Sequence, residues 1–309
     1  MNNNLIYDLG VYDGEDSEYF LNKGYNVIGV ECNPNKISLL KNKFKNEINS
    51  SKFKLIDKCI SDKSNELIHF YISSHEDWSS TNSNIANRAY IVNDINVETI
   101  TLYDLFKKFG VPYYCKIDIE GNDYKALSSL TNLNISELPN FISAESECLG
   151  KDKKDNDDYY SVLDILYKLG YRNFLLYDYW SNGIILNYDI KNCNPHDLVF
   201  NNQDYIWMDY DTIKSFIKNT WRRKDGNYMF WADIFASKHW IFKWKFLYLY
   251  VNKTIKIMEI FIYLIIFMFV YIVVDTLFSL IGVTISITWF LIKFAIKLFV
   301  VYIIFKCIF

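Results

Sequence analysis

The residues with the clearest chemical potential form the segment DLGVYDG, residues 8–14. This segment follows a short apolar run and has the pattern D-x-G-x-x-x-G, in which glycines permit a tight turn and a close approach of the backbone to a ligand. Glu31 lies 23 residues after Asp8. An acid at similar spacing accepts hydrogen bonds from ribose hydroxyls in dinucleotide-binding proteins. The pattern therefore predicts a site for a nucleoside.

The spacing of the two glycines separates two classes of nucleoside cofactor. The dinucleotide fingerprint G-x-G-x-x-G places backbone N–H groups on a pyrophosphate. Here Gly10 and Gly14 are four residues apart, and Asp8 precedes them. A carboxylate at that position would repel a pyrophosphate but suits the cationic amino-acid moiety of S-adenosylmethionine. The pattern favours S-adenosylmethionine over NAD, although an ordinary βα turn could carry the same residues.

A second pair of acids occurs in the segment KIDIEGND, residues 116–123. Asp118 and Glu120 are two residues apart, so in an extended segment their side chains face the same side. Both would then point into a cleft at the strand end, unless they are simply solvated. If the reaction removes a proton from a hydroxyl, a positioned base is needed. Glu120 is the first candidate for this base and Asp118 the second.

Two further residues are candidates for the chemical step. His75 lies in the polar stretch 74–98, which is expected to be a long loop that could close over the cleft. The alternative interpretation is that His75 is an ordinary solvated histidine of this loop. Glu145 ends the next apolar run and could orient an acceptor. Since no His, Cys and Asp cluster shows metal-ligand spacing, we expect no metal.

The elements that must position these residues alternate between short apolar runs and helical patterns. Helices are expected at 15–23, 34–44 and 158–169, and strands at 5–9, 25–31, 53–56, 67–72, 113–118, 140–144 and 174–177. This alternation predicts a doubly wound, Rossmann-like α/β fold with a mostly parallel sheet and helices on both faces. Ligands of such sheets lie outside the carboxyl ends of the strands, where Asp8, Glu31 and Asp118 are expected.

Composition limits the possible partners. The 309 residues contain 33 Lys and Arg against 36 Asp and Glu, a net charge of −3, which does not indicate a nucleic-acid partner. The start of the chain has no pattern of a secretory signal peptide. No two cysteines form a C-x-x-C pair, so we expect buried, reduced thiols in a cytosolic protein. The six cysteines are Cys32, Cys59, Cys115, Cys148, Cys193 and Cys307.

The last part of the chain is strongly apolar. Residues 257–274 contain one charge, Glu259, and residues 276–305 contain Lys293 and Lys297 as their only charges. A stretch of about 18 such residues is long enough to span a bilayer. We expect a hydrophobic tail over 257–309 with two transmembrane helices, at about 257–274 and 283–305. The alternatives are a last segment that lies in the membrane interface and a buried soluble helix.

A basic and aromatic segment, residues 241–256, precedes the tail. It contains Lys243, Lys245, Lys253 and Lys256, with Trp244 among them. Positive residues flanking a membrane span stay on the cytoplasmic side, and aromatic residues lie at the interface. The sequence therefore predicts a membrane protein whose catalytic domain faces the cytosol.

Three segments resemble one known family, the FkbM-type S-adenosylmethionine-dependent methyltransferases. IYDLGVYDGEDSEYFLNKGYNVIGVECNP resembles the first motif of this family, and VPYYCKIDIEGNDYKAL its lysine-isoleucine-aspartate-valine-glutamate-glycine motif. CISDKSNELIHFYIS is similar to the segment after the third strand. The resemblance implies a class I methyltransferase fold over residues 1–240, with a core at 5–178 and a C-terminal extension at 179–240.

The resemblance also implies roles for single residues. It places S-adenosylmethionine with its sulfonium end facing Asp118 and Glu120, and its ribose on Glu31. The methionine part would lie on the first loop and the adenine after the third strand; the residues so implied are Asp8, Gly10, Tyr12, Gly14, Cys59 and Ile60. The family usually has Ala-Asn where this chain has Val11-Tyr12.

The sequence therefore predicts an S-adenosylmethionine-dependent methyltransferase. Its acceptor would be a hydroxyl of a glycan, a lipid or a small molecule at a membrane. One alternative is a catalytically inactive methyltransferase-like membrane scaffold, because Tyr12 departs from the family pattern. The other is an enzyme of nucleotide sugars or NAD on a similar sheet, which the glycine spacing disfavours.

Overall fold

The computed structural model describes residues 2–149, 157–178, 183–184, 194–200, 207–220, 229–238, 273 and 276. The chain divides into two compact units, residues 1–241 and 242–309. The elements described below belong to the first unit, and Val273 and Thr276 are the described residues of the second.

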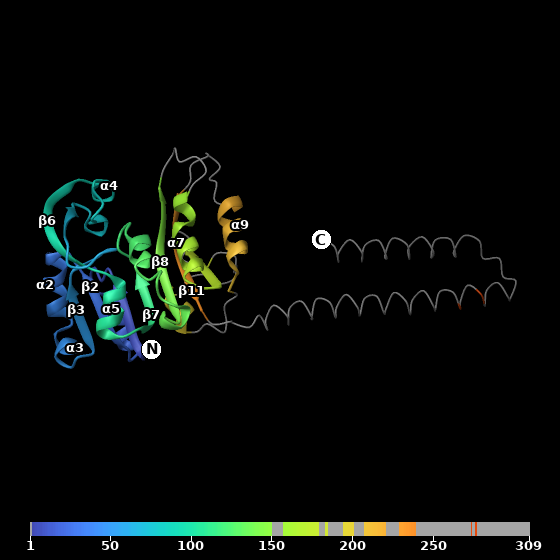
Figure 1. Ribbon diagram of the computed structural model, residues 1–309, viewed down its shortest axis with the longest axis horizontal. Helices are drawn as coiled ribbons and strands as arrows, with labels where there is room; N and C mark the ends of the chain where they lie inside the picture. Colours follow the sequence, from blue (N-terminus) through green and yellow to red (C-terminus); the bar gives the residue numbers. More distant parts are fainter. Residues whose placement is uncertain are drawn as a thin grey trace, which may run out of the picture. The chain divides into compact units, whose positions relative to one another are not determined.

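The first unit is built around a mostly parallel sheet, which has eight strands among the described residues (Figure 1). Neighbours from β3 to β8 run parallel, whereas β11 runs antiparallel to both β8 and β9. From edge to edge the strands are β3 (Phe53–Asp57), β2 (Asn26–Glu31), β1 (Asn2–Leu9), β7 (Pro112–Ile117), β8 (Phe141–Leu149), β11 (Met229–Ser237), β9 (Asn173–Asp178) and β10 (Gly183–Ile184).

The order of the strands creates a switch point between β1 and β7. Along the chain the strands first extend from β1 to β3 on one side and then from β7 onward on the other side. Leu9 is in register with both Val30 and Ile117. The next residues, Gly10, Glu31 and Asp118, consequently lie at one edge of the sheet. This is the edge at which doubly wound folds bind their ligands.

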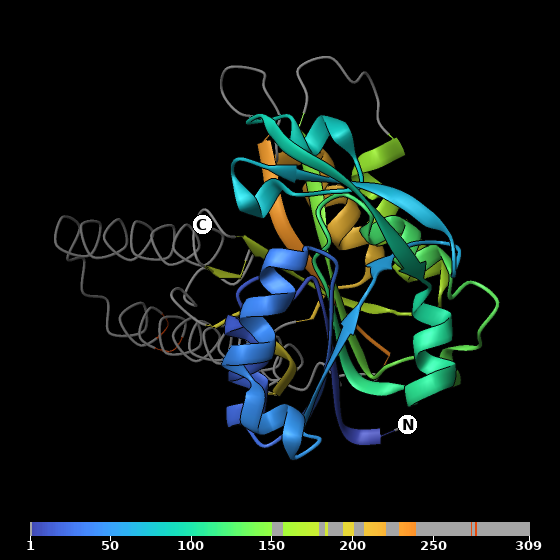
Figure 2. The same ribbon diagram turned by 90° about the vertical axis from the view of Figure 1, so that its left-hand side faces the viewer.

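Helices cover both faces of the sheet, as expected for a doubly wound fold. One apolar core joins Ile6 of β1 to Phe20 and Leu40, and the opposite core joins Tyr7 to Leu105. In Figure 2 the blue helices of the first face and the teal helix α5 lie on opposite sides of the sheet. The first face carries α1 (Glu15–Asn22), α2 (Pro34–Lys43), α3 (Lys45–Asn49) and α8 (Asp197–Phe200); the second carries α5 (Leu102–Phe109), α6 (Asp123–Ser128), α7 (Asp157–Lys168) and α9 (Tyr210–Thr220).

Short-range capping explains where two of these helices begin. The Asn33 side chain accepts a hydrogen bond from the backbone N–H of Asn35 at 3.1 Å, and Pro34 occupies the first helical turn of α2. Thr101 caps α5 by accepting from the N–H of Asp104 at 3.0 Å. Such caps satisfy backbone donors that no helical carbonyl can reach. The helices expected at 15–23, 34–44 and 158–169 are confirmed.

A second sheet contradicts the expectation of a long loop at 74–98. It consists of β4 (Cys59–Ile60), β6 (Ile91–Ile100) and β5 (Leu67–Ser73), with β6 antiparallel to β5 and parallel to β4. Between β5 and β6 lie the short helices η1 (Glu76–Trp78) and α4 (Ser83–Ala86). The polar residues of β6 obscured its strand pattern, because its backbone pairs with β5 while half of its residues stay exposed.

The two expected membrane spans, at 257–274 and 283–305, fall outside the described residues, as does the juxtamembrane segment 241–256. Among the residues that the structure does describe, no helix combines the length and the apolar character needed to cross a bilayer.

Candidate active site

A cavity of about 370 Å³ opens at the switch point, a volume within the range of small-molecule sites. Its wall includes Gly10 and Tyr12 from the first loop, Glu31 after β2 and Asp118 after β7. The two loops contact each other directly, since the N–H of Asp118 donates to the carbonyl of Leu9 at 3.0 Å. Three segments far apart in the sequence thus meet at one site, as the strand-end acids predicted.

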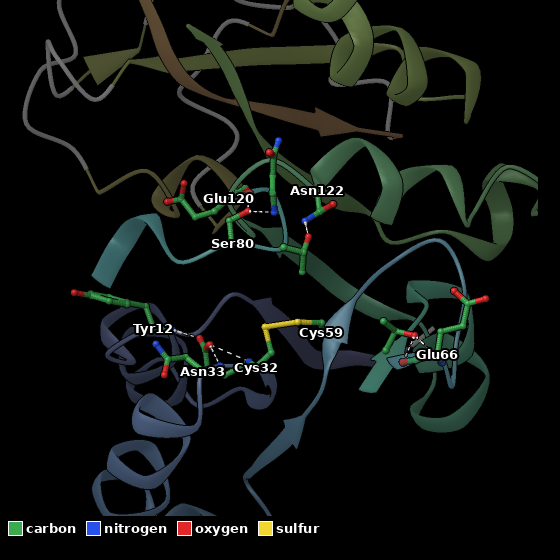
Figure 3. Close-up of a disulfide and its surroundings, with 12 residues drawn as sticks. Tyr12, Cys32, Asn33, Cys59, Glu66, Ser80, Glu120 and Asn122 are labelled. Carbon is green, nitrogen blue, oxygen red and sulfur yellow. Dashed lines mark hydrogen bonds between the residues drawn. A yellow bond between two sulfur atoms is a disulfide. The ribbon is translucent and has the colours of Figure 1, made fainter. Parts of the chain in front are cut away.

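Glu31 is held by backbone donors from two loops. Its Oε1 accepts hydrogen bonds from the N–H groups of Cys32 at 2.9 Å and Asn33 at 2.8 Å, and its Oε2 accepts from Tyr12 at 2.9 Å (Figure 3). Burial raises the pKa of this carboxyl, and the three backbone bonds oppose that shift. A carboxylate has about four acceptor positions. One position consequently stays available to a ligand hydroxyl in the cavity.

Asp8 and Gly14 do not belong to the cavity wall. Asp8 is fully buried behind it and accepts a hydrogen bond from Ser17 Oγ at 2.6 Å. Burial raises its pKa to about 6, and the charge of Lys116 opposes the shift. Gly14 has a φ of 83°, and a Cβ there would lie 2.6 Å from the Phe44 ring. The structure therefore gives these two residues internal positioning roles in place of the expected contacts with a cofactor.

A buried ion network reinforces this wall. Lys116 Nζ lies 2.9 Å from Asp16, 3.2 Å from Asp118 and 3.7 Å from Asp8. His196 Nε2 lies 2.8 Å from the other oxygen of Asp16. Burial by itself would raise the pKa of Asp16, but Lys116 and His196 together hold this pKa well below its usual range. The network fixes the carboxylates that face the cavity.

The sequence reasoning missed most of this network. Lys116 opens the second motif and could have been noticed there, because it directly precedes strand-end residues. Asp16 sits in the first turn of α1, where acids are common at helix starts. His196 comes from a distant segment that carried no recognisable pattern. Asp233 of β11, which also lines the cavity, was missed although it lies in the C-terminal extension that the resemblance implied.

Three predicted acids meet in the cavity. Asp118, Glu120 and Glu145 each present a carboxylate oxygen, and these oxygens lie within 4.8 Å of one another. Such a group could hold a metal ion, which the sequence spacing had not indicated. Nearby, burial raises the pKa of Asp123 to about 8, and the charge of Asp118 adds to the shift. The structure thus brings Asp118, Glu120 and Glu145 together, and their roles in the chemical step stay predictions.

Glu120 lies in a tight turn of the backbone. Its φ is 50°, and Gly121 follows with a φ of 88°. Ser80 Oγ donates to the Glu120 carbonyl at 2.7 Å, and the Asn122 side chain donates to Thr81 Oγ1 (Figure 3). The segment after η1 is thereby attached to the turn that carries Glu120.

His75 does not line the cavity, but the next two residues along the chain do. The His75 ring stacks on Trp78 with centroids 4.4 Å apart, and more than half of its side chain is exposed. Glu76 instead pairs with Lys36 Nζ at 2.5 Å, and Lys36 lies 3.8 Å from the centre of the Tyr12 ring. The expectation that His75 reaches the cleft is not met, although the segment that carries it does cover the cavity.

Cys32 and Cys59 form a disulfide, so the expectation of reduced thiols is wrong for this pair. Their Cα atoms are 5.0 Å apart, within the usual range for a disulfide. Both cysteines and Ile60 line the cavity beside Glu31. Sequence spacing carried no signal for the pair, because only the approach of β4 to the end of β2 brings them together. Cys115 keeps a buried free thiol.

The family model described as "Methyltransferase FkbM domain" matches residues 8–173. A comparison with curated proteins finds no match.

Among solved structures, the chain is similar to the methyltransferase FkbM from Methylobacillus flagellatus KT, with 15% identity and a TM-score of 0.37. That alignment covers 56% of this chain and 40% of the other, so this chain spans about two fifths of that structure.

A methyltransferase from Archaeoglobus fulgidus that depends on S-adenosylmethionine has 12% identity and a TM-score of 0.35, covering 77% of this chain and 87% of that chain. The phosphoethanolamine N-methyltransferase 2 of Haemonchus contortus, in complex with S-adenosyl-L-methionine, has 12% identity and a TM-score of 0.36. Coverage is 77% of this chain and 49% of that one.

Proposed function

Because this chain belongs to the FkbM family of S-adenosylmethionine-dependent methyltransferases, we propose that it methylates a hydroxyl oxygen of an acceptor that enters the cavity beside Glu120. S-adenosylmethionine supplies an electrophilic methyl group on a sulfonium centre. The observation that carries the proposal is one cavity lined by two unlike sets of residues. Glu31 and Ile60 belong to β2 and β4. Of the three acids, Asp118 and Glu120 follow β7 and Glu145 belongs to β8, with β1 lying between β2 and β7 in the sheet.

The residues present fit the adenosine part of this cofactor. Glu31 is fixed by three backbone donors and lines the cavity, so its carboxylate can accept a hydrogen bond from a ribose hydroxyl. Ile60 offers an apolar surface for a base, beside the Cys32–Cys59 disulfide. At Gly10 a Cβ would clash with the Asp118 carbonyl, and its absence leaves room for the two loops to meet.

The three acids suit a methyl transfer, because carboxylates can face the positive sulfonium of the cofactor and can take the proton that the acceptor hydroxyl loses. Asp118 lies in the wall near Lys116, which holds its carboxylate in place. Glu120 is half-buried on its turn and is the first candidate to take the acceptor proton. Glu145 is buried, its carboxylate lies within 4.8 Å of that of Glu120, and it would orient the acceptor hydroxyl. Holding nucleophile and methyl group in line can lower the barrier of such a reaction by about 7–11 kcal/mol.

The segment from Glu76 to Thr81 would exclude water from the cavity. It is attached at one end through Glu76 to Lys36 and at the other through Ser80 to the Glu120 carbonyl. Glu76, Asp77, Ser79 and Thr81 all line the cavity. Closure over a reacting pair strengthens electrostatic interactions inside a site.

We further propose that the acceptor is a glycan, a lipid or a small molecule at a membrane. The support is the apolar tail, with spans proposed at 257–274 and 283–305 after the basic and aromatic segment 241–256. Four lysines in that segment favour a catalytic domain on the cytosolic side. A protease-protection assay with a tag after Phe309 tests this topology. Tag and domain on the same cytosolic side are expected, and extraction of the chain by carbonate would contradict membrane integration.

Calorimetry with S-adenosylmethionine tests the cofactor site of the full chain. We expect binding by the wild type and a loss of at least about tenfold in affinity for Glu31→Ala, because a hydrogen bond to a charged group contributes about 1.5–3 kcal/mol. Glu66→Ala is the matched control, since Glu66 is exposed and lies outside the cavity. Equal affinity of the Glu31 variant would contradict the ribose assignment. Binding without methylation of any acceptor in a membrane extract would favour an inactive scaffold.

A further inference from the structure

From the placement of Cys32 and Cys59 we infer that this pair is a thiol–disulfide switch that controls how tightly the cofactor binds. The inference rests on the proposed function, because it concerns the adenosine end of the same cavity. The disulfide joins the residue after β2 to the first residue of β4. It therefore links the main sheet covalently to the small three-stranded sheet.

The disulfide acts on Glu31 through one residue of backbone. Cys32 follows Glu31 directly, and its N–H donates to Glu31 Oε1 at 2.9 Å. The N–H of Asn33 donates to the same oxygen at 2.8 Å. The covalent bond from Cys32 to Cys59 (Figure 3) fixes this turn. The oxidised pair would therefore hold the Glu31 carboxylate in the orientation that its backbone donors give it.

Reduction must disturb the wall of the cavity. Two unbonded sulfur atoms need more room than a bonded pair, so at least one side chain has to move when the bond breaks. Cys59 is buried, Cys32 is half-buried, and both face the cavity. The movement would consequently displace either the Glu31–Asn33 turn or the start of β4 beside Ile60. Either displacement would weaken the binding of the adenosine part of the cofactor.

The location also decides how a reductant reaches the bond. Because both cysteines line the cavity, a thiol reaches the disulfide through the space that the adenosine part would fill. A thiolate attacks one sulfur and forms a mixed disulfide, which a second thiol resolves. With a dithiol reductant, the Sγ–Sγ bond gains two electrons and two protons to give two cysteine thiols, and the reductant becomes a disulfide. A bound cofactor would block this approach.

Coupling between two sites is reciprocal. The factor by which reduction weakens cofactor affinity must therefore equal the factor by which bound cofactor disfavours reduction of the disulfide. In the oxidised chain we expect S-adenosylhomocysteine, an unreactive probe of the cofactor site, to bind about tenfold more tightly than in the reduced chain. We also expect the probe to protect the pair against dithiothreitol.

The test uses the full 309-residue chain under native conditions. Calorimetry measures the affinity for S-adenosylhomocysteine before and after dithiothreitol, and alkylation followed by peptide mass spectrometry assigns the thiols that appear to Cys32 and Cys59. C115A is the matched control for the buried free thiol of Cys115 and should respond as the wild type does. C32S/C59S should have one affinity, unchanged by dithiothreitol.

Two results would overturn the inference alone. One is equal affinity of the oxidised and the reduced wild type, and the other is complete alkylation of Cys32 and Cys59 in a chain treated with an oxidant. Absence of binding in both redox states would overturn the proposed function as well. Comparing two states of the wild type keeps the test valid if the double variant does not fold.

Discussion

A Cβ atom at Gly10 would lie 1.8 Å from the carbonyl oxygen of Asp118, so the two segments that carry the site meet backbone to backbone. Gly10 also has a φ of 83°, a conformation that other residues adopt only at a cost. The glycine of the first motif is therefore needed both for its turn and for the approach of the second motif.

Gly10→Ala should destabilise the fold and abolish cofactor binding, because the alanine methyl forces the Asp118 loop away. Gly24→Ala is a matched control: Gly24 has a φ of 91° but no atom within 4 Å of its Cβ position. The control should lose only about 1–2 kcal/mol, the cost of the left-handed conformation. Urea unfolding of both variants measures the difference. Equal losses would show that the contact with Asp118 is unimportant.

Glu120→Gln should lower kcat by about 10²–10⁴-fold, the usual contribution of a positioned base. The affinity for S-adenosylhomocysteine should stay close to that of the wild type, since the substitution keeps the shape of the side chain. Asp118→Asn should lower both kcat and the affinity for S-adenosylmethionine, because the proposed site places Asp118 beside the sulfonium charge, which S-adenosylhomocysteine lacks. Glu66→Gln, on an exposed residue outside the cavity, serves as the control. Full activity of the Glu120 variant across pH would exclude this residue as the base.

Asp123→Asn should stabilise the protein at neutral pH. Burial raises the pKa of Asp123 to about 8 in the folded chain, whereas the pKa of an aspartate in an unfolded chain is about 4. The folded state holds the proton more tightly, so the stability of the wild type falls as pH rises from about 4 to about 8. Between about pH 5 and pH 7.5 this fall is on the order of 3 kcal/mol. The amide of the variant cannot titrate, so the gain over the wild type should grow with pH.

Thermal unfolding across this pH range measures the effect, with Asp62→Asn on the exposed surface as the control. A gain that does not change with pH would show that Asp123 is already ionised in the folded chain.

Asp16→Asn should destabilise the fold at neutral pH, by about 1–2 kcal/mol, because Lys116 and His196 lose a common partner. The expected loss of stability is small because about a third of the Asp16 side chain is exposed and solvent screens its charge. The two basic groups hold the pKa of Asp16 well below its usual range, although burial opposes them. The stabilisation is thus present above about pH 4 and is lost as pH falls further.

Chemical denaturation of wild type and variant at several pH values checks this loss. The two curves should converge in acid and separate at neutral pH. Parallel curves would mean that Asp16 contributes no charge-dependent stability.

The strand-end acids show how far the sequence leads. Asp8, Glu31 and Asp118 each follow an apolar run that proved to be a strand, and the register of β1 with β2 and β7 places all three strand ends at one edge. Parallel order could be inferred because strands alternate with helices along the chain. The roles within that edge could not be inferred, since Asp8 turned out to lie behind the cavity wall while Asp16 lines it.

The sequence by itself determined the features that depend on neighbours in the chain: the apolar strands, the helix that begins at Pro34, the glycine turn at Gly10, and the family. Only the tertiary structure decided the features that depend on distant segments. The Cys32–Cys59 disulfide, the contact of His196 with Asp16 and the pairing of β6 with β5 are of this kind. The physical reason is that backbone preferences and hydrophobic periodicity act over a few residues, whereas these contacts form only after the sheets have assembled.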